Sequence, residues 1–249
     1  ARRRSRQERR GMSLYREHGI VLRTYRLGEA DRIVVFVTRG HGKVRAVAKG
    51  VRKTKSRFGS RLEPGSHVAL QLYEGRELDI VTQAESVDHF RAIRDDLDRL
   101  AGAQVMLEAT DQVSQEHEPD ARLYQLLLGA LRTLAGSGSP LVVPAFLLKL
   151  LAADGVQPLV EICASCGEDT PLVAFDLGAG GLLCRSCRSG VAVSPDAVSL
   201  LQDVLGGRLN AALAEPASEA TREVTHLATS AMEHHLERRL RTVDALDHA

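Results

Sequence analysis

The sequence predicts a multidomain protein in which an N-terminal all-β barrel is followed by an all-α helical bundle that carries an inserted four-cysteine module. Between residues 19 and 85, apolar and polar residues alternate with a period of two, in short runs separated by Gly-rich turns. From Asp88 the apolar spacing becomes helical, and all four cysteines of the 249-residue chain fall between positions 163 and 187. The expected divisions are a basic extension, native or left over from cloning (1–11), a barrel (12–86), a helical domain (87–159 and 191–242), a cysteine insert (160–190) and a tail (243–249).

Five short strands are expected in the barrel, because each run is bounded by Gly, Glu-Gly or Asp turn signals. In the run 43–49, Val44 and Ala46 point to one face while Lys43 and Arg45 point to the other. Five antiparallel strands within about seventy residues fit an OB-fold, the five-stranded barrel with oligonucleotide-binding loops. An SH3-like barrel fits the same pattern nearly as well. The strands are expected at 19–25, 31–38, 43–49, 66–73 and 78–85.

Helices are expected wherever the 3.6-residue period follows a capping residue. Phe90, Ile93, Leu97 and Leu100 form the stripe of a first helix, with Asp88 as its cap. A second helix opens after residues 119–120, and a third spans 141–154 beyond a Gly/Ser/Pro break. A fourth begins at residues 194–196, where a serine precedes a proline at the first helical position. A last, long amphipathic helix begins after residue 218 and runs to about 241.

The cysteines form two C-x-x-C pairs, Cys163 with Cys166 and Cys184 with Cys187, separated by 17 residues. Two residues between thiolates allow both to bind one tetrahedral Zn²⁺ at about 2.3 Å. Two disulfides would need an oxidising compartment, a thioredoxin-like pair would need a βαβ unit, and a catalytic zinc would need an open coordination position. The pattern therefore predicts one structural zinc ion per chain, held by all four cysteines.

Positive charge is concentrated at the N-terminal end of the chain. Residues 1–62 contain 19 Lys and Arg against 4 Asp and Glu, whereas residues 63–249 contain 14 and 28. Such asymmetry is typical of a polyanion-binding segment, although a run of charge can also be a merely solvated loop. Phe58 lies within the most basic stretch, where an exposed ring could stack on an unpaired base. The predicted nucleic-acid-binding residues are Arg23, Arg26, Arg32, Arg39, Lys43, Arg45, Lys49, Arg52, Lys53, Lys55, Arg57, Phe58 and Arg61.

Two long stretches resemble the family of bacterial recombination mediators called RecO. Residues 19–81 resemble its N-terminal domain, and residues 146–167 with 180–187 resemble its helical domain and zinc module. The resemblance extends from Met12 to about Arg241. It implies binding to single- and double-stranded DNA, annealing of complementary strands, and no enzymatic activity. It also implies cooperation with RecR and single-stranded DNA-binding protein to load RecA.

The resemblance implies one further contact, made by the acidic, Phe-ended tail of single-stranded DNA-binding protein. That tail would dock on an apolar groove with a cationic rim in the helical domain, for which Lys149 is the candidate. An RNA-binding or ribosome-associated zinc-ribbon protein is the alternative, because it would combine the same parts. An enzyme is disfavoured by the absence of P-loop, G-x-S-x-G and H-E-x-x-H motifs. No run is apolar enough to cross a membrane, and no secretory signal is apparent, so a cytoplasmic, nucleoid-associated protein is expected.

Overall fold

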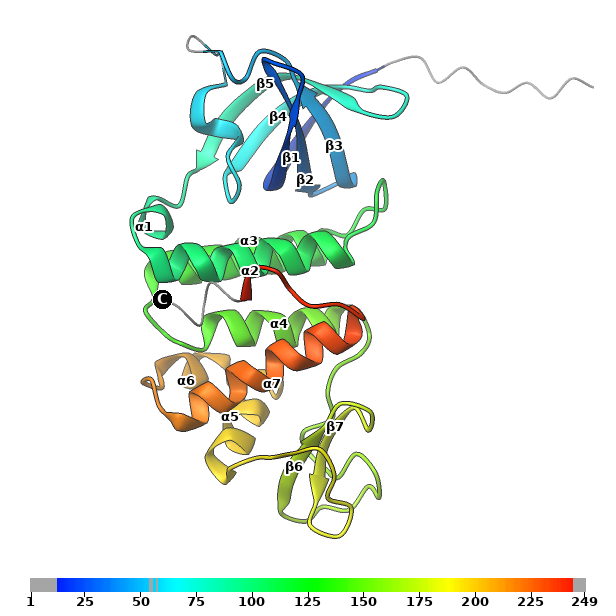
Figure 1. Ribbon diagram of the computed structural model, residues 1–249, viewed down its shortest axis with the longest axis vertical. Helices are drawn as coiled ribbons and strands as arrows, with labels where there is room; N and C mark the ends of the chain where they lie inside the picture. Colours follow the sequence, from blue (N-terminus) through cyan, green and yellow to red (C-terminus); the bar gives the residue numbers. More distant parts are fainter. Residues whose placement is uncertain (1–12, 54–55, 57, 244–249) are drawn as a thin grey trace, which may run out of the picture.

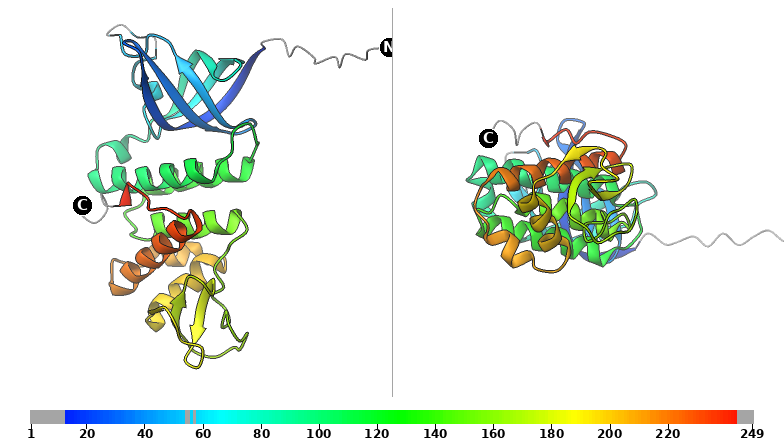
Figure 2. Two further views of the ribbon diagram at one scale, coloured as in Figure 1. Left: turned by 45° about the vertical axis from the view of Figure 1, so that its right-hand side comes forward. Right: turned by 90° about the horizontal axis from the view of Figure 1, so that it is seen from below.

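The computed structural model describes residues 13–53, 56 and 58–243, arranged as three parts along one long axis (Figure 1). A β-barrel lies at one end, layers of helices form the middle, and a small sheet lies at the other end. The second view agrees with this order (Figure 2). The predicted fold class is confirmed.

The barrel is built from β1 (Leu14–Leu27), β2 (Asp31–Thr38), β3 (Gly42–Ala48), β4 (His67–Tyr73) and β5 (Asp79–Asp88). The strands close in the order β1-β2-β3-β5-β4, with β3 and β5 parallel and the other neighbours antiparallel. This is an OB-like barrel. A 3₁₀ turn, η1 (Gly59–Leu62), lies between β3 and β4. The first strand begins five residues earlier than the sequence pattern indicates, because its half-exposed N-terminal part pairs with β4.

The helical part comprises α1 (Arg91–Arg94), α2 (Leu97–Val113), α3 (Ala121–Gly136), α4 (Val142–Ala153), α5 (Pro195–Leu205), α6 (Leu209–Ala214) and α7 (Glu219–His235). Side chains of Asp120, Ser194 and Ser218 accept hydrogen bonds from the first turns of α3, α5 and α7. The starts of these helices are therefore where their capping residues predict them. None of the helices within the described residues is long and apolar enough to span a membrane.

The first expected helix is wrong in position. Strand β5 continues to Asp88, whose carboxylate accepts from the N–H of Phe90 in a turn, and Phe90 has a left-handed φ of 45°. The long helix instead begins at Leu97, which is 80% exposed and so is not part of an apolar stripe. The central part of α2 is buried around its whole circumference, between the barrel and the other helices, and a helix buried on all sides shows no amphipathic period. At the other end of the helical part, α7 ends at His235 rather than near residue 241.

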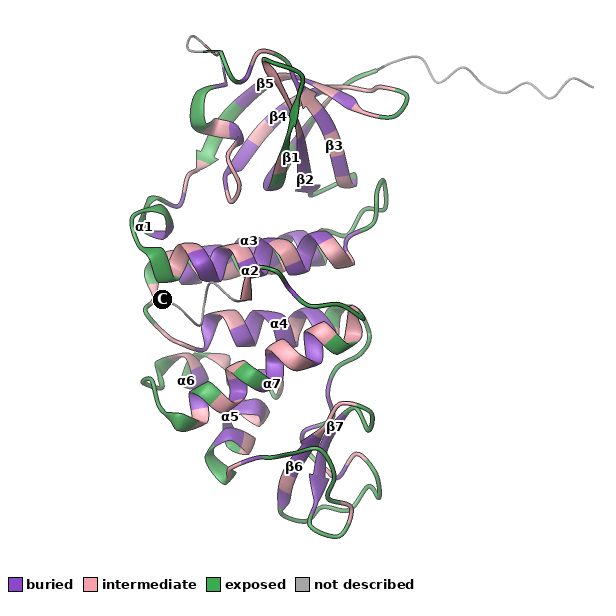
Figure 3. Cartoon of the chain, in the orientation of Figure 1, coloured by how far each residue is buried: buried purple, intermediate pink, exposed green. Residues whose placement is uncertain are grey.

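The barrel has an apolar core of its own, and the outer face of two of its strands belongs to the core of the helices. Val21, Val34 and Phe36 point into the barrel, whereas their neighbours Ile20, Leu22, Val35 and Val37 point outward and pack against the helical layers. Buried residues accordingly continue from the barrel through the helices (Figure 3). The two strands are buried on both faces, which is why their sequences read as unbroken apolar runs.

The cysteine insert forms the small sheet, from β6 (Leu172–Asp176), β7 (Gly181–Cys184) and β8 (Val191–Ala192), in the order β7-β6-β8. Its apolar residues Phe175 and Leu182 belong to the core of the helical part. The side-chain amide of Gln202 on α5 donates to the carbonyl of Val160 at 2.9 Å. The insert is thus fixed to the helices on one side and exposed on the other.

Candidate metal centre and nucleic-acid interface

The two cysteine pairs meet in space. Cys163 and Cys166 occupy a turn before β6, Cys184 ends β7, and Cys187 lies in the following turn, so that all four sulfur atoms are within 4.8 Å of one another. All four are free thiols, and Cys163 and Cys184 are buried. Gly167 has the left-handed φ of 75° that the first turn requires, and its N–H donates to the carbonyl of Cys163 at 2.8 Å. The cluster is a site that could hold a metal ion.

Backbone dipoles at this cluster favour the thiolate form that binds metal. The backbone N–H groups of Cys166 and Cys184 point at the sulfur of Cys163 and lower the pKa of its thiol to about 6. Backbone hydrogen bonding from Cys187 likewise lowers the pKa of the Cys184 thiol. Each pair therefore combines one thiol of lowered pKa, Cys163 or Cys184, with one of raised pKa, Cys166 or Cys187.

A hollow of about 680 Å³ lies beside the barrel, between the start of β1, the β4–β5 turn and the α2–α3 loop. Its lining includes Glu74 and Asp79, and Tyr15 donates a hydrogen bond to Asp79. Burial, together with this bond to Asp79, raises the pKa of Tyr15. Nearby, the imidazole of His41 contacts the buried Glu17 at 2.5 Å. The lining of this hollow is mixed in charge, since Arg76, His41 and His117 accompany the two carboxylates.

Three of the predicted DNA-binding cations face the helical part. Arg23 pairs with Asp111 of α2 at 2.9 Å, and the ammonium of Lys43 lies 2.7 Å from the Asp111 carbonyl and 3.5 Å from its carboxylate. Arg45 pairs with Glu116 at 3.4 Å. The side chain of Lys43 is only 15% exposed, so the expectation that Lys43 faces DNA is corrected: it joins the barrel to α2.

Arg32 and Arg61 also have partners within the barrel. Arg32 pairs with Glu63 at 2.8 Å, which ties β2 to the segment after η1. The guanidinium of Arg61 on η1 lies 3.5 Å from the carbonyl of Phe58. Arg39 is exposed in the β2–β3 turn, at the end of the barrel that faces the helices. Lys55 and Arg57 lie outside the described residues.

The other cations gather at the opposite end of the barrel, where Figures 1 and 2 show the β1–β2 turn and the loop after β3. Arg26, Lys49, Arg52 and Lys53 are exposed there, and we call these four residues the distal basic end. The backbone N–H of Arg52 donates to the carbonyl of Ala30 at 3.0 Å, and its guanidinium donates to that of Glu29 at 2.9 Å. Hydrogen bonds therefore hold the two loops side by side, which concentrates their charge.

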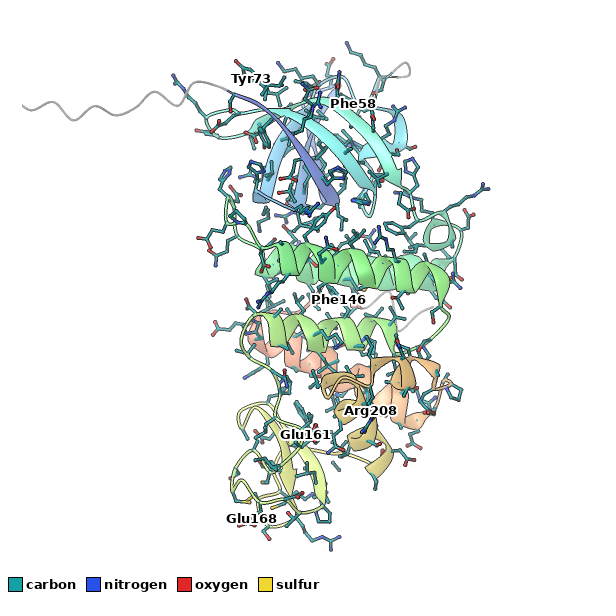
Figure 4. The ribbon with its side chains drawn as sticks, turned by 180° about the vertical axis from the view of Figure 1, so that it is seen from behind. Phe58, Tyr73, Phe146, Glu161, Glu168 and Arg208 are labelled. Atoms are coloured by element: carbon teal, nitrogen blue, oxygen red, sulfur yellow. The ribbon has the colours of Figure 1, made fainter. Side chains whose placement is uncertain are left out.

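Phe58 is not an exposed stacking residue. Its side chain is 1% exposed and packs in the barrel core with Val51 and Leu62 (Figure 4). The loop after β3 folds over the end of the barrel, and burying these three apolar side chains closes the core. The exposed aromatic residue of the barrel is Tyr25, at 42%. The sequence feature that indicates Tyr25 as a candidate is its position in β1, two residues after Arg23 and therefore on the same face of the strand.

An apolar groove runs between α3, α4 and α6, with a volume of about 250 Å³. Phe146 forms part of its wall (Figure 4), and Leu209 and Leu213 of α6 close one side. Lys149, one turn after Phe146 on α4, is the charged residue in its lining and is half-buried. The structure thus places the predicted partner-binding residue at the edge of an apolar groove.

Comparison with known proteins identifies the family. The family model described as recombination protein O N terminal matches residues 12–90, and the one described as recombination protein O C terminal matches residues 94–244. The DNA repair protein RecO of Frankia casuarinae is 47% identical over 244 residues, which cover 96% of this chain and 100% of the relative. The proteins of that name from Streptomyces coelicolor and Thermobifida fusca are 46% and 44% identical, over 93% and 96% of this chain and 98% and 100% of their own lengths. The chain belongs to the recombination protein O family.

Proposed function

We propose that the chain is a non-enzymatic recombination mediator in DNA repair that binds single- and double-stranded DNA and anneals complementary strands. With RecR and single-stranded DNA-binding protein as partners, it would help to load RecA onto coated single strands. The observation that carries the proposal is the distal basic end, four exposed cations on an OB-like barrel. Such barrels use their loops to bind oligonucleotides, and cations that follow a phosphate backbone bind without sequence preference. The names of the relatives and the family support a role in DNA repair.

Salt dependence tests the DNA surface. Each phosphate contact on a single strand adds about −0.7 to the slope of log affinity against log salt concentration. Reversing Lys49 and Lys53 to Glu removes two exposed cations from the distal basic end, so the slope should become shallower by about 1.4 and affinity should fall equally on unrelated sequences.

The matched control reverses Arg122 and Arg222, which are exposed on α3 and α7 and change the net charge by the same amount. Equal slopes for the Lys49/Lys53 variant and this control would mean that the distal basic end does not contact phosphates. Competition with RNA of the same sequence separates the DNA-binding proposal from an RNA-binding protein: strong preference for RNA would favour the latter. Strand annealing with and without single-stranded DNA-binding protein then tests the mediator activity.

We also propose that the metal is Zn²⁺ with a structural role. Four cysteine sulfurs within 4.8 Å can form a closed tetrahedral shell, and thiolates favour zinc over harder cations. When bound, zinc would cross-link the two turns of the insert that carry the cysteine pairs. Freshly purified, reduced protein should contain about one zinc per chain, and Cys184→Ser or a chelator should lower the melting temperature. Substoichiometric zinc in such protein would contradict the proposal.

The groove between α3, α4 and α6 would receive the acidic tail of single-stranded DNA-binding protein. Its apolar wall suits the terminal Phe of the tail, and Lys149 suits an adjacent carboxylate. Lys149→Glu should weaken binding of the tail peptide, whereas Lys149→Arg should retain it because the charge is kept. If Lys149→Glu binds the peptide as tightly as the parent does, the peptide docks elsewhere.

A further inference from the structure

We propose that Tyr25 is the base-stacking residue of the barrel and strengthens binding of unpaired DNA over paired DNA. This inference rests on the proposed DNA-binding function and adds the residue that distinguishes the two forms of DNA. It transfers to Tyr25 the role that the sequence suggested for Phe58, whose side chain is buried.

Tyr25 is the aromatic residue that remains available for stacking. All five Phe and all four Tyr lie within the described residues, and among them Tyr25 alone is an exposed large side chain. At 42% exposure the ring offers apolar area that a ligand could cover. A base stacked on the ring would cover that area.

The position of Tyr25 suits a strand of DNA bound at the distal basic end. Tyr25 pairs with Ile33 across β1 and β2, and the next pair is Arg26 with Arg32. The β1–β2 turn begins three residues after Tyr25, or about 10 Å along the strand at about 3.3 Å per residue. Arg52 donates to carbonyls of that turn. Because side chains alternate along β1, Arg26 points to the opposite face from Tyr25, so a single strand bound at Arg52 would reach the ring by continuing along the face of β1 that carries Arg23.

The ring is held in place before DNA binds. The guanidinium carbon of Arg23 lies 5.0 Å from the centre of the Tyr25 ring, a cation–π contact between neighbours on one face of β1. Arg23 is itself fixed by Asp111, whose side chain is 3% exposed, at 2.9 Å. Because the ring is oriented by groups that are already ordered, stacking costs less conformational entropy. Asp111 is in this sense a positioning residue for Tyr25.

The test compares three probes at one length: a labelled thymidine homopolymer, its duplex with adenosine homopolymer, and an abasic oligonucleotide that keeps the phosphates but has no bases. Tyr25→Ala should weaken binding of the homopolymer by about 5- to 150-fold, the range for losing one stacked base. Its salt slope should not change, because no phosphate contact is lost. Binding of the duplex and of the abasic probe should stay at the parent level.

Two variants control for other effects. Tyr25→Phe keeps the ring and should bind as the parent does, whereas Leu27→Ala removes exposed apolar area without a ring and should change nothing. Asp111→Asn should weaken homopolymer binding when Tyr25 is present but not when it is combined with Tyr25→Ala, because Asp111 acts through the Tyr25 ring. If Asp111 had a purely structural role, the substitution would weaken binding with and without Tyr25.

The outcomes separate the stacking proposal from the DNA-binding proposal. If the parent binds the homopolymer with a steep salt slope and Tyr25→Ala binds it equally well, stacking by Tyr25 is refuted and the DNA surface stands. An equal loss on the abasic probe would also refute stacking, because the ring would then contact the backbone. If the parent binds none of the probes at low salt, the DNA-binding proposal fails and the stacking proposal fails with it.

Discussion

Replacing Phe58 with Ala tests whether the loop after β3 closes the barrel. Phe58 is 1% exposed and is one of only two aromatic residues, with Phe36, among the buried residues of the barrel core. Removing a buried Phe ring costs about 3–5 kcal/mol, from lost burial and the cavity left behind. That is a large part of the roughly 5–15 kcal/mol that stabilises a typical folded protein. For a chain of this size each kcal/mol lowers the melting temperature by about 2–4 °C, so a fall of about 6–20 °C is expected.

Thermal unfolding followed by circular dichroism measures this loss, and DNA binding is measured well below both melting temperatures. Phe58→Leu is the control: it keeps most of the apolar volume and should cost less than about 1.5 kcal/mol. Where the Ala variant is folded, single- and double-stranded affinities should change together or not at all. An unchanged melting temperature with a selective loss on single strands would refute the buried position of Phe58 and restore it as a stacking residue.

Two further predictions concern the junction between barrel and helices. His67 is buried against Tyr124, and burial, followed by the charges of His18 and Arg132, lowers its pKa below the usual 6.5. The folded protein then binds a proton at His67 less readily than the unfolded chain does, so the free energy of unfolding should be constant above about pH 6.5 and fall as the pH drops below that value. Urea unfolding measures this curve, and His67→Asn should flatten its part below pH 6.5. An unchanged slope in the variant would assign the pH dependence to other groups. Asp111→Ala should cost toward the lower end of about 3–5 kcal/mol in the same assay, because it leaves the largely buried Lys43 without its carboxylate; a loss below about 1 kcal/mol would show that the pair is effectively solvated.

Features set by neighbours in sequence were predictable. Helix starts at α3, α5 and α7 follow from Asp120, Ser194 and Ser218, because a capping side chain reaches backbone groups only two or three residues away. The cysteine cluster follows from spacing in the same way, since each pair forms its half of the site within a single turn. Barrel strands are recognisable because the period of two is local.

Features set by distant partners could not be read from the pattern. Asp111 lies 68 residues beyond Lys43, and nothing in the alternation of β3 indicates that Lys43 pairs with a carboxylate on a helix. The sequence also leaves open which aromatic ring is exposed. Phe58 and Tyr25 both have basic residues close by in the sequence, and only the closing of the barrel by the loop decides which of the two is buried. The unbroken apolar runs of β1 and β2, in contrast, do indicate strands that are covered on both faces.

The outward-facing residues of those two strands limit how the molecule can be divided. A barrel cut from the chain near residue 88 would present Ile20, Leu22, Val35 and Val37 to water as one apolar patch, on adjacent antiparallel strands. Apolar patches of this kind on isolated fragments promote self-association. In the remaining helical fragment, α2 would lose the barrel surface against which it is buried. If a truncated barrel failed to bind DNA, its aggregation would therefore be a sufficient explanation, and the result would say nothing about its DNA-binding residues. Point substitutions in the full-length chain are the appropriate way to assign functions to its two parts.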